Sequence, residues 1–359
     1  MSEMWCGRAD AARTLSCGLA TKLLRGLDLS LRRLAAGAMT GLCMVAAQAS
    51  DAPIGPIFVL NSLDSNVSVI DPLGFNELRR IPTGKQPHHL YLTPDNKTLI
   101  IGNAGGDSLT LIDPLSGALK GTIAGIADPY HLRFSPDMNW FVIAANRLNR
   151  VDIYRWDPQR GDKPLTLAAA VPAARTPSHL AIDSQSKVVY ASLQDSDQLI
   201  AIDLATHKPR WTVRVGKMPA DIYLTPDDRL LLVALTGDEF VEVYDVSLPV
   251  PQRVQRIRTG AGAHAFRSRG DDRHVFVSNR VANTISKIDL KTLAVVDEYA
   301  APGGPDCIDT LGDGKTLLVT SRWARKLTYI DTEQRRVIRQ VDVGRSPHGV
   351  WTLDHAPRR

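Results

Sequence analysis

Two sequence markers recur at intervals of 42 to 48 residues along most of this chain. The first is an aspartate that follows a short apolar segment: Asp71, Asp113, Asp157, Asp203, Asp245, Asp289 and Asp331. The second is a turn residue, usually proline: Pro87, Pro129, Pro177, Pro219, Ala263, Pro305 and Pro347. A period of this length, with several short strands in each repeat, is typical of propeller blades. We therefore predict an all-β fold, a seven-bladed β-propeller of four-stranded antiparallel blades.

The two ends of the chain predict how the ring closes. The first repeat begins at its second strand, IFVLN, at residues 57–61. Its missing first strand matches PHGVWTL, residues 347–353, at the other end of the repeats. Because an open sheet edge is exposed to unwanted pairing, we expect the C-terminal strand to complete the N-terminal blade.

The repeated aspartates have a structural interpretation. Asp71, Asp113 and Asp157 are each followed by proline, which favours a tight turn after the third strand of a blade. An Asp side chain at that position typically accepts hydrogen bonds from backbone amides in the turn. The seven aspartates are therefore not interpreted as catalytic acids.

The first 49 residues are predicted to be a leader, and residues 50–359 to be the propeller. Arg32 and Arg33 precede an apolar run over 34–47, and Ala47-Gln48-Ala49 fits a small-x-small cleavage site. This order predicts a secretory signal peptide and a periplasmic or secreted protein, with no membrane span after leader removal. A twin-arginine export route and a disordered cytosolic N-terminus are the alternatives.

Charge and cysteine content narrow the class of protein. The leader contributes +3 of the formal net charge of +5, so the repeats are nearly neutral and nucleic-acid binding is not expected. Outside the leader the only cysteine is Cys307, so no disulfide can form within the mature chain. We interpret Cys307 as a buried, inert thiol rather than a nucleophile, and we expect a monomer.

The repeat motifs resemble those of a known family. The strand endings IFVLN, LIIGN, FVIAAN, VFVSN and LLVTS, the Pro-His turn and the Ser/Thr-Pro-Asp turn are similar to those of the YVTN-repeat propellers, which include YncE-like proteins. The resemblance covers roughly residues 56–353 and is specific for the fold. It implies a range of activities, from ligand binding to lactone hydrolysis, and so leaves the activity open.

Polar residues that the repeat does not require gather at two adjacent positions after the marker proline. Because the first strand of a blade lines the central channel, these side chains should converge at its mouth, together with three arginines from the loop after the second strand. The candidate ligand-binding residues are His88, His89, His131, His179, Asp221, His264, Asp306, His348, Arg147, Arg280 and Arg322.

These residue types favour ligand binding rather than catalysis as the function. Arginine binds carboxylates and phosphates through paired N–H donors, so the preferred hypothesis is a small anionic ligand, or a protein partner, bound at the mouth without catalysis. The alternatives are a lactonase- or lyase-like enzyme that uses a metal or a histidine there, and an accessory protein of an extracytoplasmic redox system. For a metal, His89, His131 and His179 lie at one position in consecutive repeats and are followed by Asp221. No cofactor is assigned.

Overall fold

The computed structural model describes residues 55–161 and 163–358, which form 28 strands and two short 3-10 helices, η1 (Pro158–Arg160) and η2 (Gln194–Ser196). The predicted leader lies outside these residues. No helix among those described is long and apolar enough to cross a bilayer.

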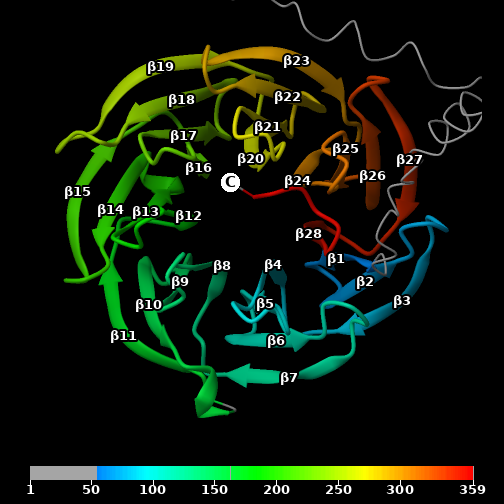
Figure 1. The fold of residues 1–359 in the computed structure, drawn as a ribbon, viewed down its shortest axis with the longest axis horizontal. Helices are drawn as coiled ribbons and strands as arrows, with labels where there is room; N and C mark the ends of the chain where they lie inside the picture. Colours follow the sequence, from blue (N-terminus) through cyan, green and yellow to red (C-terminus); the bar gives the residue numbers. More distant parts are fainter. Residues whose placement is uncertain (1–54, 162, 359) are drawn as a thin grey trace, which may run out of the picture. The chain divides into compact units, whose positions relative to one another are not determined.

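The described strands form seven antiparallel sheets of four strands, arranged as blades around a central axis (Figure 1). The innermost strands are β28 (Pro347–Thr352), β4 (Pro87–Leu92), β8 (Pro129–Phe134), β12 (Pro177–Ile182), β16 (Pro219–Leu224), β20 (Ala263–Ser268) and β24 (Pro305–Thr310). The second strands are β1 (Ile57–Asn61), β5 (Leu99–Asn103), β9 (Trp140–Ala145), β13 (Val188–Leu193), β17 (Leu230–Leu235), β21 (His274–Asn279) and β25 (Thr316–Ser321). This arrangement confirms the predicted seven-bladed propeller.

Two further strands complete each blade towards the outer edge of the ring. The third strands are β2 (Asn66–Ile70), β6 (Ser108–Ile112), β10 (Arg150–Trp156), β14 (Gln198–Asp203), β18 (Phe240–Asp245), β22 (Thr284–Asp289) and β26 (Lys326–Asp331). The outer strands are β3 (Glu77–Pro82), β7 (Leu119–Ala124), β11 (Leu165–Pro172), β15 (Lys208–Arg214), β19 (Gln252–Arg258), β23 (Ala294–Ala300) and β27 (Arg336–Asp342). The second strands are buried almost throughout, whereas the outer strands are mostly exposed.

The last strand closes the ring, as predicted. β28 pairs antiparallel with β1, with Phe58 opposite Trp351. Their rings stack with centroids 6.1 Å apart, and both side chains are fully buried or nearly so. The first blade therefore contains the N-terminal and C-terminal strands of the propeller, side by side in Figure 1.

The hydrophobic core lies between neighbouring blades rather than at one centre. One cluster joins Val142 and Ile153 of the third blade to Leu180 and Val189 of the fourth. Equivalent clusters recur around the ring. Because both faces of each sheet are covered by its neighbours, the second strands are apolar on both faces, and a chain of this length needs no single large core.

The turn after each third strand uses the repeated aspartate as predicted. In all seven turns a carboxylate oxygen accepts a hydrogen bond from the amide two residues later; these amides belong to Leu73, Leu115, Gln159, Ala205, Ser247, Lys291 and Glu333. These aspartates are therefore structural, and the polar residues around the axis are the ones that remain to be explained.

Candidate functional site

A β-bulge near the start of each innermost strand brings two consecutive side chains to the axis. In β4, for example, Pro87 pairs with Asn103 but Leu90 pairs with Ile101, so one residue is extra on the inner strand. The same shift occurs in the other six blades. Bulges re-aim side chains in this way next to many binding sites. The two adjacent positions after the marker turn residue therefore both face the channel.

The two positions form two successive layers along the axis. The first, which we call the mouth layer, contains His88, Tyr130, Ser178, Ala220, His264, Asp306 and His348. The second, the inner layer, contains His89, His131, His179, Asp221, Ala265, Cys307 and Gly349. Different cavities border the two layers, so the residues predicted to converge at one channel mouth lie in two compartments.

Asp306 is the centre of the mouth layer. Its fully buried carboxylate lies 2.8 Å from Nδ1 of His348 and 3.0 Å from Nε2 of His264. It also pairs with Arg280 and, at 3.0 Å, with Arg322. Burial opposes ionisation of Asp306, but His348 and Arg280 outweigh burial and hold its pKa well below the usual range. The carboxylate is therefore charged and fixes groups from three blades.

A cavity of about 370 Å³ opens above this layer, lined by His88, His264 and all three predicted arginines. The side chains of Arg280 and Arg322 are 18% and 31% exposed, so each is held by Asp306 and still faces the cavity. Arg147 is 54% exposed and pairs instead with Asp107 at 3.0 Å and Asp128 at 3.2 Å. We call this space the mouth cavity.

The inner layer surrounds a smaller space of about 110 Å³, the inner cavity. His89, His131 and His179 lie against one another there, with ring centroids 4.4, 5.1 and 4.9 Å apart. Asp221 lines the same cavity but accepts hydrogen bonds from the amides of Ile222 and Phe266. Burial raises the pKa of Asp221 to about 6.

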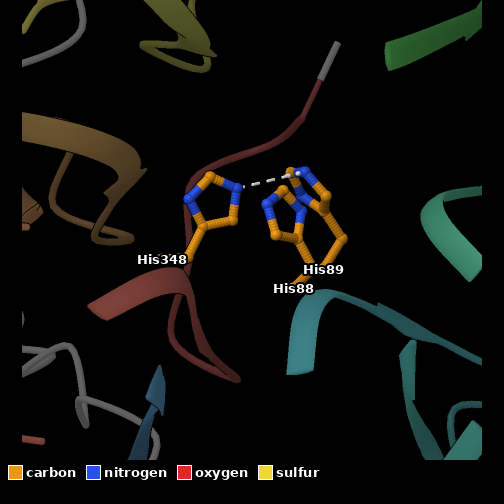
Figure 2. A group of neighbouring side chains, drawn as sticks. All are labelled: His88, His89 and His348. Atoms are coloured by element: carbon orange, nitrogen blue, oxygen red, sulfur yellow. Dashed lines mark hydrogen bonds between the residues drawn. The ribbon is translucent and has the colours of Figure 1, made fainter. Parts of the chain in front are cut away.

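Burial disfavours the charged form of the channel histidines. Burial is the main cause that lowers the pKa of His88, His89, His131 and His179 well below the usual value, and neighbouring imidazoles lower it further. In Figure 2, Nε2 of His348 points towards Nε2 of His89, at a distance of 3.4 Å. A neutral imidazole has one nitrogen lone pair that can bind a metal ion, so neighbouring histidines of the channel could hold one together.

Four channel residues with charged side chains, Arg133, Arg267, Asp309 and Arg358, were not among the predicted site residues. Arg133 lines the inner cavity, and Arg267 pairs with buried Asp309 at 2.6 Å. Arg358, after the last strand, reaches the same carboxylate at 2.9 Å. One repeat position, four residues after the marker turn residue and two after the inner-layer residue, holds Arg133, Arg267 and Asp309. The period of two along a strand could have identified these three residues, but not Arg358.

The tail that follows β28 crosses the far side of the channel. It runs to the axis of the ring in Figure 1, and Arg267 donates hydrogen bonds to the carbonyls of Ala356 and Pro357. A cavity of about 390 Å³ lies on this side, lined in part by Tyr91, Arg133 and Arg358. The two ends of the channel are therefore built differently.

Cys307 lies in the inner layer and is buried. Burial raises the pKa of its thiol well above the usual value, with the Asp306 carboxylate adding to the effect. The thiolate needed for nucleophilic chemistry is therefore disfavoured, in agreement with the predicted inert thiol.

Known proteins share this architecture. The YNCE-like beta-propeller family matches residues 28–358. The uncharacterized protein YncE of Salmonella typhi is 23% identical over 279 residues, which cover 75% of this chain and 78% of that protein. The solved structure of the periplasmic gluconolactonase PpgL of Pseudomonas aeruginosa aligns with a TM-score of 0.70 and 18% identity, covering 83% of this chain and 98% of that one. A protein of unknown function from Desulfotomaculum acetoxidans aligns over the same shares with a TM-score of 0.71 and 13% identity. The chain belongs to the YNCE-like β-propeller family.

Proposed function

We propose that this protein binds a small anionic molecule in the mouth cavity and does so outside the cytoplasm. The observation that carries the proposal is the convergence of Arg147, Arg280 and Arg322 from three blades on one cavity of about 370 Å³. A concave site with a few convergent polar groups is the usual form of a small-molecule site.

The charge balance at the cavity supports an anion. Arg280 and Arg322 share one carboxylate, Asp306, so this group keeps one positive charge in excess. Each guanidinium has several N–H groups, and Asp306 accepts from only one nitrogen of each, Nη2 of Arg280 and Nη1 of Arg322. Donors therefore remain that could bind a carboxylate or phosphate in a charge-assisted hydrogen bond. An acidic loop of a protein partner could make the same contacts, but the volume favours a small molecule.

Lactone hydrolysis is the second candidate, because the periplasmic gluconolactonase PpgL has the same fold. His264 would be the natural general base at the mouth. Its Nε2 faces Asp306 at 3.0 Å, however, and its Nδ1 is buried without a partner. A base must come within hydrogen-bond reach of the proton that it removes. The arrangement therefore supports binding better than acid–base catalysis.

An extracytoplasmic location is supported by two separate observations. The sequence of residues 1–49 has the charged, apolar and small-residue order of a signal peptide. The similar gluconolactonase is described as periplasmic. Fractionation of cells that express the full chain, followed by N-terminal sequencing of the mature protein, tests this part of the proposal. Recovery of an uncleaved chain in the cytoplasm would refute it.

Binding is tested by calorimetric titration with a panel of sugar acids, short dicarboxylates and inorganic phosphate. We expect at least one anion to bind the full chain and to lose ten-fold or more in affinity when both Arg280 and Arg322 become glutamine. Because that change leaves the Asp306 carboxylate without its arginine partners, a triple variant that also carries Asp306→Asn removes the unpaired negative charge and should still fail to bind. Arg214→Ala on the exposed outer strand β15 is the control and should bind normally. Equal affinity in all variants would reject the mouth cavity as the anion site.

A further inference from the structure

We propose that the inner layer holds one transition-metal ion, Zn²⁺ or Cu²⁺, bound by His89, His131 and His179. One nitrogen from each of the three rings lies within 4.8 Å of the other two. The three residues come from consecutive blades, so the ring itself, rather than a short motif, brings them together. This site is separate from the mouth cavity and does not depend on the proposed anion binding.

Two nitrogens of this triad take no part in the hydrogen bonds of the described residues. Nδ1 of His131 and Nε2 of His179 are both buried and have no hydrogen-bond partner. Their side chains are only 5% and 1% exposed. A buried polar atom without a partner normally costs about 1–3 kcal/mol, so two of them facing one small cavity require an explanation. A bound metal would satisfy both.

The hydrogen bonds around the triad leave the remaining lone pairs available. Ser178 can donate its hydroxyl proton to Gln194 and accept Nδ1–H of His179, which places the lone pair of His179 on Nε2. This is the buried nitrogen without a partner. Histidine ligands of metals commonly have their second nitrogen fixed in this way, which sets the tautomer and the ring orientation.

A second chain of contacts orients His89. Asp306 accepts Nδ1–H of His348, so Nε2 of His348 carries a lone pair and can accept Nε2–H of His89 at 3.4 Å (Figure 2). This tautomer leaves the lone pair of His89 on Nδ1, free for a metal. Asp306 and His348 are thus positioning residues for His89, one step away from the metal.

Another group of histidines is less suitable. His88, His89 and His348 also bring their nitrogens close together. The rings of His88 and His348, however, are packed against each other with centroids 3.7 Å apart. Rings of the His89–His131–His179 triad are 4.4 to 5.1 Å apart, which leaves room for an ion between their edges.

The donor set and the cavity indicate which ions fit. Three imidazoles without a carboxylate suit zinc or copper, which bind imidazole nitrogen well, whereas calcium and magnesium prefer oxygen. The inner cavity of about 110 Å³ borders all three rings and has room for water or a small anion as a fourth ligand. A three-histidine site with one open position is a known arrangement for zinc.

The test measures metal binding by the full chain, purified without a histidine tag. Elemental analysis should find about one zinc or copper per chain, and competition with a chromogenic chelator should give a single site. The double variant His131→Gln/His179→Gln should lose affinity by a hundred-fold or more. His274→Gln, at the start of β21 and bonded to Asp271, is the control and should bind as the wild type does. Folded wild-type protein that binds no stoichiometric metal would overturn the proposal.

Three single variants, His348→Asn, His179→Gln and His88→Gln, keep the proposal falsifiable if the double variant does not fold. His348→Asn should weaken binding by about 10- to 100-fold without abolishing it, as expected for a group that only orients a ligand. Electron paramagnetic resonance of the Cu²⁺-loaded wild type should show coupling to nitrogen, and this coupling should change in His179→Gln. Loss of binding in His88→Gln with full retention in His179→Gln would place the ion elsewhere. Because the arginines of the mouth are not ligands, variants at Arg280 and Arg322 should still bind metal.

Discussion

Two buried carboxylates on the same strand, Asp306 and Asp309 of β24, are held by arginines in different ways. Both are fully buried. Asp306 binds Arg280 and Arg322, which border the mouth cavity. Asp309 binds Arg267 and Arg358, so its network includes the tail after β28. One strand therefore carries a cluster that faces a cavity and a cluster that fixes the end of the propeller.

The difference lies in what surrounds the arginines. Arg267 is 5% exposed, and its other donors bond to the carbonyls of Ala356 and Pro357. Arg280 and Arg322 keep contact with solvent through the mouth cavity. An ion pair closed off from water is costly to break, while a pair beside water can be rehydrated. The Asp309 cluster thus has a structural role, and the Asp306 cluster is available for a ligand.

The largest effect on stability is expected from Asp309→Ala. This change leaves Arg267 buried without a carboxylate, and breaking a buried pair in this way costs about 3–5 kcal/mol. Asp306→Ala should cost less, about 1–3 kcal/mol, because water in the mouth cavity can solvate the two arginines. Urea unfolding followed by circular dichroism measures both free energies of unfolding. A greater loss for Asp306→Ala would show that the mouth cluster is the main structural one.

The next effect is a pH dependence from Asp309. Burial opposes its ionisation, but Arg358 and Arg267 outweigh burial and lower its pKa below the ordinary value of about 3.9. Because the folded-state pKa is the lower one, the stabilisation is complete above about pH 4 and is lost as the pH falls further.

The difference in unfolding free energy between wild type and Asp309→Asn should therefore shrink as the pH falls below about 4. Urea midpoints at several pH values measure it. Asp342→Asn on β27 is the control, since that side chain is 87% exposed and its variant should follow the wild type at every pH. A constant difference down to pH 3 would mean that Asp309 is not charged in the folded protein.

The sequence predicted the ring because each blade repeats the same local signals. The marker turn before β4 and the Asp113 turn after β6 are set by nearby residues and recur with one period. The closing strand could be predicted because residues 347–353 match the first strand of other blades. The propeller fold and the closing of its ring could therefore be predicted from turn and strand signals that neighbouring residues set.

The division of the site into two cavities could not be predicted in the same way. His88 and His89 are adjacent in sequence, and only the β-bulge in β4 turns both towards the axis and separates them into two layers. The sharing of Asp306 by Arg280 and Arg322 depends on distances between blades, which no local signal contains. Arg358 was missed because the tail carries no repeat marker.

A smaller effect is expected from Arg358→Ala. Arg267 still pairs with Asp309 in this variant, and the side chain of Arg358 is 33% exposed, so solvent reduces the loss. We expect a decrease of about 1 kcal/mol in the free energy of unfolding. Arg336→Ala on β27, where the exposed arginine donates a hydrogen bond to Gln334, is the matched control and should have little effect. A loss as large as that of Asp309→Ala would mean that Arg358, not Arg267, is the essential partner.

The smallest effect is expected from Arg147→Gln at the mouth. Its ion pair with Asp107 is open to water, and exposed pairs contribute at most about 1 kcal/mol. Its other partner, Asp128, is buried. Asp128 also accepts hydrogen bonds from the amides of Arg147 and Leu148, so its carboxylate keeps partners when the guanidinium is removed.

Stability should therefore hardly change in Arg147→Gln, and affinity for an anion in the mouth cavity should fall only a few-fold. The reduction should disappear near 1 M salt, where screening acts over about 3 Å, because Arg147 would act on the ligand through its charge at a distance. Calorimetric titration at low and high salt separates this contribution from direct contact. A reduction that persists at high salt would mean that Arg147 contacts the anion directly, and would extend the ligand-facing cluster from Asp306 to the Asp128 side of the mouth.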